Sequence, residues 1–269
     1  MATFADRSLT NAHLKRGRAR EHLNNLKAQV KAFTDNTAQF VTAEFDEKTR
    51  DYVLRAHIKG RSDPALSLVV GEFLHNLRSS LDAIMWQLAV PSPQRPSAIQ
   101  FPIFKDSHDG TDPGTGRRID GYHDSGLRQL QDIDPAVEPT VKALQPCFAA
   151  NPELHPLWVL SRLHNIDKHR TVLLTVAQIG IAGFAFRHGD PADVTVVHQQ
   201  VGPLEDGAEI YRLRIREGSD VQLQPHVSFK VALDKSGTAM DEWPIGNVLG
   251  DLYRFVNQEV FPAFKKFFP

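Results

Sequence analysis

The chain has 269 residues but only one cysteine, and it contains no long apolar run. Because Cys147 stands alone, an internal disulfide framework and a zinc cluster built on cysteines are both excluded, which is typical of a protein from a reducing compartment. No stretch approaches the roughly 18 apolar residues of a membrane-spanning helix, and the first residues lack the apolar core of a signal peptide. We therefore expect a cytoplasmic protein that does not enter a membrane.

An excess of one charge is also missing. The 31 lysine and arginine residues are balanced by 32 aspartate and glutamate residues, so any surface for nucleic acid must be local. A hydrophobic content of 41% with 23% charged residues is ordinary for a globular protein. The length allows one large domain or two smaller ones, and we interpret the chain as a single composite domain over 1–269.

Helical periodicity dominates the first 170 residues and returns at the end of the chain. Apolar residues recur at three- and four-residue spacing over 8–33, 65–90, 154–170 and 242–266, which predicts long amphipathic helices. Shorter helices are expected at 125–133 and 136–148. We interpret the loop-rich segment 91–118 as a mobile surface loop, except that its apolar island QFPIF is expected to pack on the core.

Alternating apolar and polar residues predict strands in two places. Residues 39–58 are expected to form a β-hairpin, and the strands in 171–240 are separated by short, turn-like loops that favour an antiparallel meander. This order of elements predicts an α+β fold, in which long helices pack on one side of the antiparallel β-meander and an additional β-hairpin lies near the N-terminus. Residues 1–170 are then mainly helical, 171–240 form the sheet and 241–269 contain a C-terminal helix.

The segment 154–170 carries the most promising set of polar side chains. In a helix, at about 100° per residue, its positions i, i+4, i+7 and i+11 fall on one stripe. An indole, a guanidinium, an amide and an imidazole occupy that stripe, whereas leucine and isoleucine occupy the opposite side. The polar stripe consists of Trp158, Arg162, Asn165 and His169.

A second polar stripe follows the apolar seam of 65–90 and consists of His75, Arg78 and Asp82. In one interpretation it forms the facing side of a cleft whose other side is the stripe of 154–170. In the other, Arg78 and Asp82 form an ordinary ion pair four residues apart and His75 is partly buried. Similarly, Trp158, Arg162 and His169 have a purely structural interpretation, in which they stabilise the end of their helix.

Several other motifs give weaker signals. GTDPGTGRR lacks the GK[ST] of a phosphate loop, and the pair His108-Asp109 has no second ligand cluster, so we expect no metal site and no cofactor. A basic run in the first helix has two interpretations: it contacts the phosphate backbone of a nucleic acid, or it is a solvated helix face. The run consists of Lys15, Arg16, Arg18 and Arg20. The aromatic tail FPAFKKFF is expected to pack against the N-terminal helices or against a second subunit.

The blocks GEFLHNLRSSLDAIMWQLA and HPLWVLSRLHNIDKHR resemble the signature blocks of an uncharacterised bacterial protein family with patterns close to HNLRxxLDH and NIDKHR. This resemblance spans residues 65–175 and implies no particular activity. More distantly, an arginine followed after four to six residues by a histidine resembles the HEPN superfamily. Active members of that superfamily are metal-independent ribonucleases found among toxins and antiviral defence effectors.

The HEPN pattern fits Arg162 and His169, whereas Arg78 is followed at the corresponding position by Ala83. The resemblance thus implies a ribonuclease in which Arg162 holds the phosphate, His169 transfers a proton and Asn165 assists. One histidine covers only one proton-transfer role, and HEPN sites are completed across a dimer, so the resemblance implies a C2 homodimer. The residues expected to contact RNA are His75, Arg78, Asp82, Lys168 and Arg170.

Two alternatives remain open. In the first alternative, the chain is an interaction protein without enzymatic activity, and its aromatic tail and amphipathic sheet form a surface for a homodimer or another partner. In the other, a small molecule binds between the helices and the sheet, where Arg212 and Arg214 alternate with apolar residues.

Overall fold

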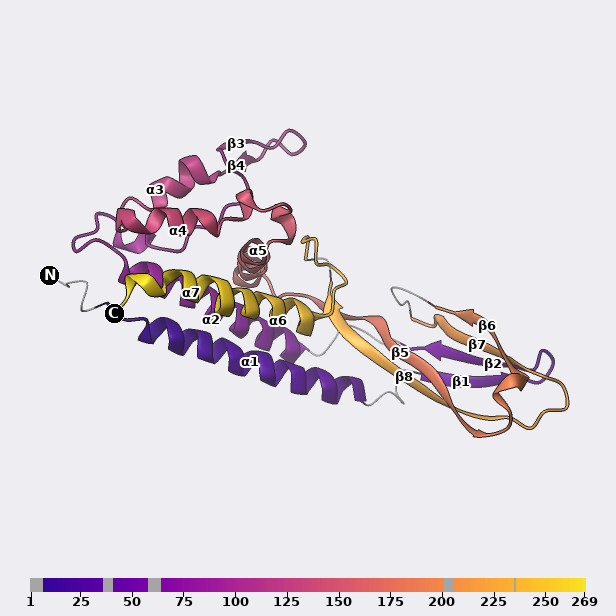
Figure 1. Cartoon of the computed structure of the whole chain (residues 1–269). Helices are drawn as coiled ribbons and strands as arrows, with labels where there is room; N and C mark the ends of the chain where they lie inside the picture. The colour runs from indigo at the N-terminus through magenta and orange to yellow at the C-terminus, as the bar shows by residue number, and fades with distance from the viewer. Residues whose placement is uncertain (1–6, 36–40, 58–63, 201–205, 235) are drawn as a thin grey trace.

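The computed structural model describes residues 7–35, 41–57, 64–200, 206–234 and 236–269. Figure 1 shows an elongated molecule, with a body of helices at one end and the long strands at the other. The helices and the antiparallel strands confirm the α+β class expected from the sequence.

Long amphipathic helices build the helical body at the positions that their periodicity predicts. α1 (Thr10–Asp35) and α2 (Pro64–Gln87) lie side by side, α5 (Pro156–His169) packs on α2, and α6 (Ile245–Phe255) packs on both α1 and α5. The apolar seam expected in 65–90 is fully buried in their common core, at Leu74, Leu77, Leu81, Ile84 and Leu88.

The helix expected over 242–266 is interrupted by a change of helix type. α6 is followed by a π-helical turn, Val256–Val260, then by α7, Phe261–Phe264, and by a 3₁₀ turn, Lys265–Phe267. Pro262 has no N–H to donate and its ring crowds the preceding turn, which accounts for the wider turn just before it.

The aromatic tail packs inside this chain. Phe261, Phe264 and Phe267 are all buried in the main core, and the ring of His13 in α1 lies 5.0 Å from the ring of Phe261. The first of the two alternatives for the tail, packing against the N-terminal helices, is therefore confirmed.

The segment between α2 and α5 is more ordered than a surface loop. Its apolar island enters the core as expected, because Phe101 and Phe104 are buried. A small hairpin follows, made of β3 (Gly110–Thr111) and β4 (Arg118–Ile119). The remaining elements are short: a π-helical turn Tyr122–Gly126, α3 (Leu127–Gln129), α4 (Glu138–Ala143) and 3₁₀ turns at Pro96–Ala98, Pro135–Val137, Pro146–Phe148 and Pro152–Leu154.

Two antiparallel sheets form the other end of the molecule. The expected hairpin is present as β1 and β2, apart from residues 39, 40 and 58, which lie outside the described residues. A four-stranded sheet has the order β1-β2-β7-β6, and a two-stranded ribbon consists of β5 and β8. The strands are β1 (Val41–Asp46), β2 (Asp51–Ala56), β5 (Leu174–His188), β6 (Val194–Gln199), β7 (Glu209–Ile215) and β8 (Gln222–Leu233), with a 3₁₀ turn at Pro191–Asp193.

The connectivity of these strands differs in detail from a succession of neighbouring hairpins. The first strand of the region 171–240, β5, is long, and it pairs with β8 instead of β6. β7 pairs with β6 on one side and with β2 of the N-terminal hairpin on the other. On this sheet Asp51 is 1% exposed and accepts hydrogen bonds from Arg212 and Arg214, so both arginines are held within the sheet.

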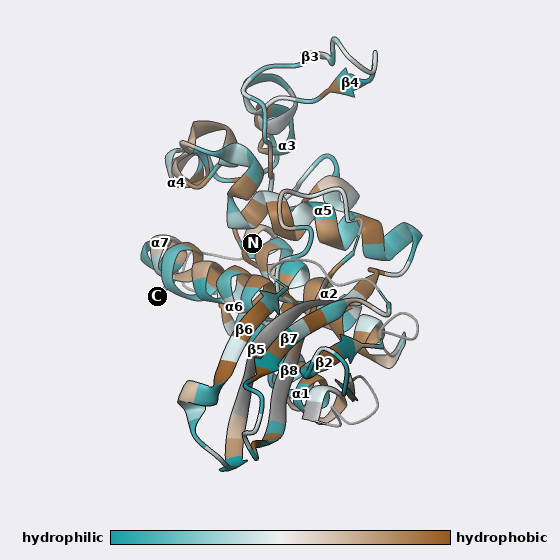
Figure 2. Cartoon of the chain, turned by 90° about the vertical axis from the view of Figure 1, so that its right-hand side faces the viewer, coloured by the Kyte–Doolittle hydropathy of each residue, from teal (hydrophilic) through white to brown (hydrophobic). Residues whose placement is uncertain are grey.

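No helix among the described ranges combines the length and the apolarity needed to cross a membrane. In Figure 2, hydrophilic and hydrophobic positions both occur along α5 and α6.

Candidate functional site

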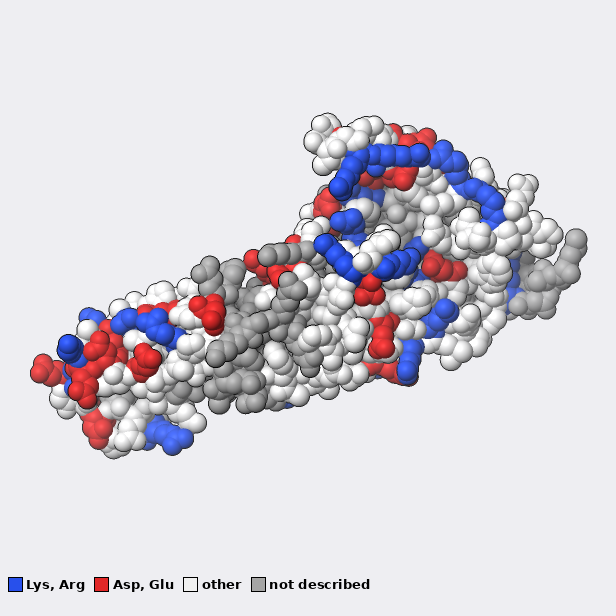
Figure 3. Space-filling model, turned by 180° about the vertical axis from the view of Figure 1, so that it is seen from behind, with Lys and Arg blue, Asp and Glu red and all other residues white. Residues whose placement is uncertain are grey.

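A basic cleft lies between α2, α5 and the β3–β4 hairpin, with a volume of about 630 Å³. Seen from behind, lysine and arginine side chains frame a hollow on the helical half of the molecule (Figure 3). The six basic residues of its lining outnumber its four carboxylates, so the cleft has an excess of positive charge that the whole chain lacks. The basic residues are Arg78, Lys105, Arg117, Arg118, Arg162 and Lys168, and the carboxylates are Asp106, Asp112, Asp120 and Glu153.

Half of these basic side chains form no ion pair with a carboxylate of the described residues. Arg78, Lys105 and Arg118 each form an ion pair, the last two with Glu153 and Asp120, both at 2.8 Å. The other three have no ion-pair partner within the part of the chain that the structure describes, and they are Arg117, Arg162 and Lys168.

Arg78 reaches the cleft from α2 and also binds the backbone of the segment around Phe101, which lines the cleft. Its Nη2 donates to the carbonyl oxygen of Phe101 at 2.7 Å, and Asp82 Oδ1 accepts from the Phe101 N–H at 2.9 Å and lies 3.2 Å from Arg78 Nη2. The Nη1 atom of Arg78 is buried and has no hydrogen-bond partner. Burial lowers the pKa of this guanidinium, although the carboxylate of Asp82 partly opposes the shift.

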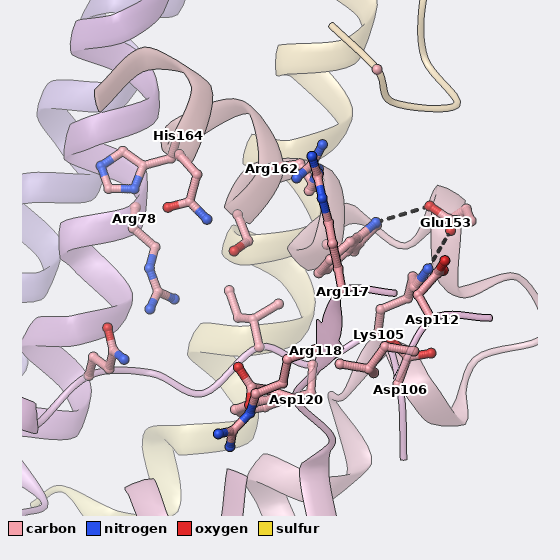
Figure 4. Close-up of a pocket in the computed structure, with 18 of the residues that line it drawn as sticks. Arg78, Lys105, Asp106, Asp112, Arg117, Arg118, Asp120, Glu153, Arg162 and His164 are labelled. Atoms are coloured by element: carbon pink, nitrogen blue, oxygen red, sulfur yellow. Dashed lines mark hydrogen bonds and ion pairs between the residues drawn. The ribbon is translucent and has the colours of Figure 1, made fainter. Parts of the chain in front are cut away.

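His164 reaches the same cleft from α5 and is only 6% exposed. Its Nε2 atom is also buried and unpartnered. Burial lowers the pKa of His164 to about 4, and the nearby charges of Lys168 and Arg78 act in the same direction. The imidazole is therefore neutral at neutral pH, and Figure 4 shows it beside Arg78 at one side of the cleft.

The contact between α2 and α5 brings further ionisable groups next to His164. The imidazole rings of His75 and His164 lie 5.9 Å apart across the two helices. One turn along, Asp167 covers Gly71 so closely that a Cβ at residue 71 would lie 2.5 Å from Asp167 Oδ1. Burial raises the pKa of the Asp167 carboxyl, and His75 partly opposes this shift. Two imidazoles and a carboxylate are thus grouped at the contact between α2 and α5, and of these three groups His164 lines the cleft.

An indole ring lies at the other side of the cleft. Trp158 Nε1 donates to Glu153 Oε2 at 3.1 Å, and the guanidinium carbon of Arg162 lies 6.0 Å from the centroid of the Trp158 ring. The Nζ atom of Lys105 is 5.7 Å from the same centroid. Cations and an aromatic surface therefore occur together, as they do in sites for single-stranded nucleic acid.

The two stripes predicted from the sequence do meet in part. Arg78 from the first stripe lines the same cleft as Arg162, Asn165 and Lys168 of α5. The Arg78–Asp82 ion pair of the structural interpretation is present as well, but His75, which was expected to be partly buried, is exposed.

The remaining predicted site residues lie outside the lining of the cleft. The ring of His75 lies against the ring of His164, which lines the cleft. Asp82 forms an ion pair with Arg78 and accepts a hydrogen bond from the Phe101 N–H. His169 and Arg170 are exposed at the C-terminal end of α5. Arg162 and His169 are therefore on one helix but not in one cavity.

Sequence reasoning missed His164 because this residue lies two positions after Arg162 and is therefore off the polar stripe. It also missed Arg117, which comes from a segment interpreted as a surface loop. The hairpin that presents Arg117 is stabilised by Asp109, whose Oδ1 accepts from the Gly121 N–H at 2.7 Å. This bond, with further donors from Ser125 and Arg128, lowers the pKa of Asp109 to about 2.

Within the described ranges, no three histidine, cysteine, aspartate or glutamate side chains are grouped so that they could hold a metal ion. Comparisons with protein-family models, with curated proteins and with solved structures give no match to this chain.

Proposed function

We propose that the basic cleft binds the phosphate backbone of RNA and that the chain cleaves RNA there without a metal ion. The observation that carries this proposal is the pair of buried, unpartnered nitrogen atoms, Arg78 Nη1 and His164 Nε2, in the lining of one cleft. A buried polar atom without a partner costs about 1–3 kcal/mol, and a phosphate oxygen that accepts from Nη1 would remove much of that cost.

The surrounding groups favour a nucleic-acid phosphate over other anions. Arg117, Arg162 and Lys168 are available for phosphate oxygens because they form no ion pair among the described residues. Trp158 offers a ring on which a base can stack. In the reaction we propose, the nucleophile is the 2′-hydroxyl, which RNA has and DNA lacks, so the proposed substrate is single-stranded RNA.

The proposed reaction uses His164, which lines the cleft, and His75, an exposed residue whose ring lies 5.9 Å from the His164 ring. His164 Nε2 takes the proton of a 2′-hydroxyl, whose oxygen attacks the adjacent phosphorus, and the P–O bond to the 5′-oxygen breaks. His75 donates a proton to the departing oxygen, which leaves a 2′,3′-cyclic phosphate and a 5′-hydroxyl. Arg78 and Arg162 stabilise the charge that develops on the phosphate oxygens. This proposal moves the proton-transfer role from His169 to His164.

A homodimer remains a prediction, but the proposed reaction no longer depends on it. His75 and His164 come from one chain, so both proton-transfer roles are available without a partner subunit. The aromatic tail is a poor place to test dimerisation, since Phe264 is fully buried and its removal would disrupt the core.

The test is cleavage of labelled single-stranded RNA in the presence of a chelator. We expect wild type and His169→Ala to cleave, and His164→Ala to lose about 100-fold or more of the rate, as is usual when a general acid or base is removed. Circular dichroism confirms that each variant is folded. Undiminished cleavage by His164→Ala would refute the assignment, and loss of cleavage in His169→Ala alone would restore the role predicted for His169.

Binding of a small organic phosphate without catalysis is a second candidate function. The observation in its favour is the size of the cleft, about 630 Å³, which lies within the roughly 300–1,000 Å³ of small-molecule sites. Saturable binding of a mononucleotide, with no RNA cleavage by wild type, would favour this candidate.

A further inference from the structure

A second cavity, of about 650 Å³, lies at the end of the helical body where α1 begins and α7 ends. Figure 1 shows the C-terminus of the chain beside the first turn of α1, at this end of the molecule. Its lining shares no residue with the basic cleft. Its lining contains Arg16 from the basic run of α1 together with residues of the aromatic tail, and the proposed RNA site uses neither of these sequence features.

The lining combines positive charge with apolar surface. Its basic residues are Arg7, Arg16 and Lys265, and its apolar side chains include Leu9, Phe261 and Phe268. No aspartate or glutamate side chain is found in this lining among the described residues.

Arg16 is the central cation of this second cavity. Its guanidinium carbon lies 4.1 Å from the centroid of the Phe261 ring, and its Nε atom is buried without a hydrogen-bond partner. Neither Arg16 nor Lys265 forms an ion pair in the described part of the chain, whereas Arg7 pairs with Asp134 at 3.3 Å.

We infer that this second cavity binds an organic anion, in which a carboxylate or phosphate group is attached to an apolar body. The anionic group would accept from Arg16 and Lys265, and the apolar body would lie against Phe261 and Phe268. His13, also in the lining, has its pKa lowered by burial and by the charge of Arg16, so it is a neutral hydrogen-bonding group at neutral pH. This inference does not depend on the RNA proposal.

The experiment is calorimetric titration of the full chain with adenosine monophosphate, octanoate and inorganic phosphate. At least one organic anion is expected to bind about tenfold or more tightly than phosphate, because phosphate gains nothing from the apolar surface. Preference for the nucleotide would assign an aromatic body, and preference for octanoate an aliphatic one. No binding by either organic anion, or equal binding by phosphate, would overturn the inference.

Matched variants locate the bound anion. Arg16→Ala and Lys265→Glu are expected to weaken binding about tenfold or more. Lys265 is exposed, so its variant tests the charge without disturbing the core. The controls are Lys266→Ala, from the neighbouring residue outside the lining, and Arg162→Ala in the basic cleft. Both controls should bind like wild type. Loss of binding in Arg162→Ala with none in Lys265→Glu would show that the anion occupies the basic cleft instead, and would overturn the inference.

Discussion

Protonation of His164 should weaken the fold in mildly acidic solution. Burial lowers the pKa of this imidazole from 6.5 to about 4, so the unfolded chain binds a proton that the folded chain does not. The contribution of neutral His164 to stability is therefore complete above about pH 6.5 and is lost as the pH falls from there towards pH 4.

The size of this effect follows from the two pKa values. A lowering from 6.5 to about 4 corresponds to roughly 3 kcal/mol in total. At about pH 5, where the folded imidazole is still mostly neutral, about 2 kcal/mol of the stability present at pH 7 should be lost. His155 has its pKa lowered to about 4 by burial as well, so wild type alone would report both residues.

The assay is urea-induced unfolding at about pH 7 and about pH 5, for wild type and for His164→Gln. Glutamine does not titrate, so the variant should lose about 2 kcal/mol less than wild type between the two pH values, while the contribution of His155 cancels. Equal losses in both proteins would refute the reasoning. An NMR titration that gave His164 a pKa near 6.5 would refute it as well.

Three further predictions concern the surroundings of the cleft. Gly71→Ala places a Cβ against the carboxylate of Asp167. Because that side chain can move, the free energy of unfolding in urea should change by less than about 1 kcal/mol. RNA cleavage should fall, because the displaced carboxylate interacts with His75. Asp82→Ala removes the partner of the buried Arg78 guanidinium and should cost about 3 kcal/mol in urea unfolding, so an unchanged midpoint would contradict the ion pair's structural role. Arg117→Ala should weaken RNA binding without lowering Tm, since Arg117 has no ion-pair partner in the described chain. A lower Tm in this variant would indicate a structural role for Arg117 instead.

The elements that could be predicted from the sequence are those governed by local pattern. The apolar spacing of 65–90 and 154–170 predicted α2 and α5 because each helix buries one face in the same core. The hairpin 39–58 could be predicted for a similar reason, since its strands alternate and a short polar turn joins them. Helical spacing also brought Arg162 and Asn165 to one cavity, because their separation of three residues keeps them on one face of α5.

The parts that could not be predicted depend on long-range contacts. The pairing of β5 with β8 joins residues that are far apart in the sequence, and no local signal distinguishes it from pairing between neighbours. The role of His164 depends on α2, because only the contact with that helix buries the imidazole and brings His75 beside it. His169 continues the polar stripe of α5, but it comes at the last turn, beyond the residues that line the cleft.

Binding of a non-cleavable, 2′-O-methylated single-stranded RNA, measured as a function of salt, tests the central claim most directly. If the cleft holds the phosphate backbone, Arg162→Ala and Lys168→Ala should each weaken binding and reduce the slope of log K against log salt by about 0.7, the value for one phosphate contact on a single strand. Arg170→Ala, which removes an exposed cation just outside the cleft, should leave the slope close to that of wild type. Wild-type slopes in both cleft variants, or an equal reduction in Arg170→Ala, would contradict the account.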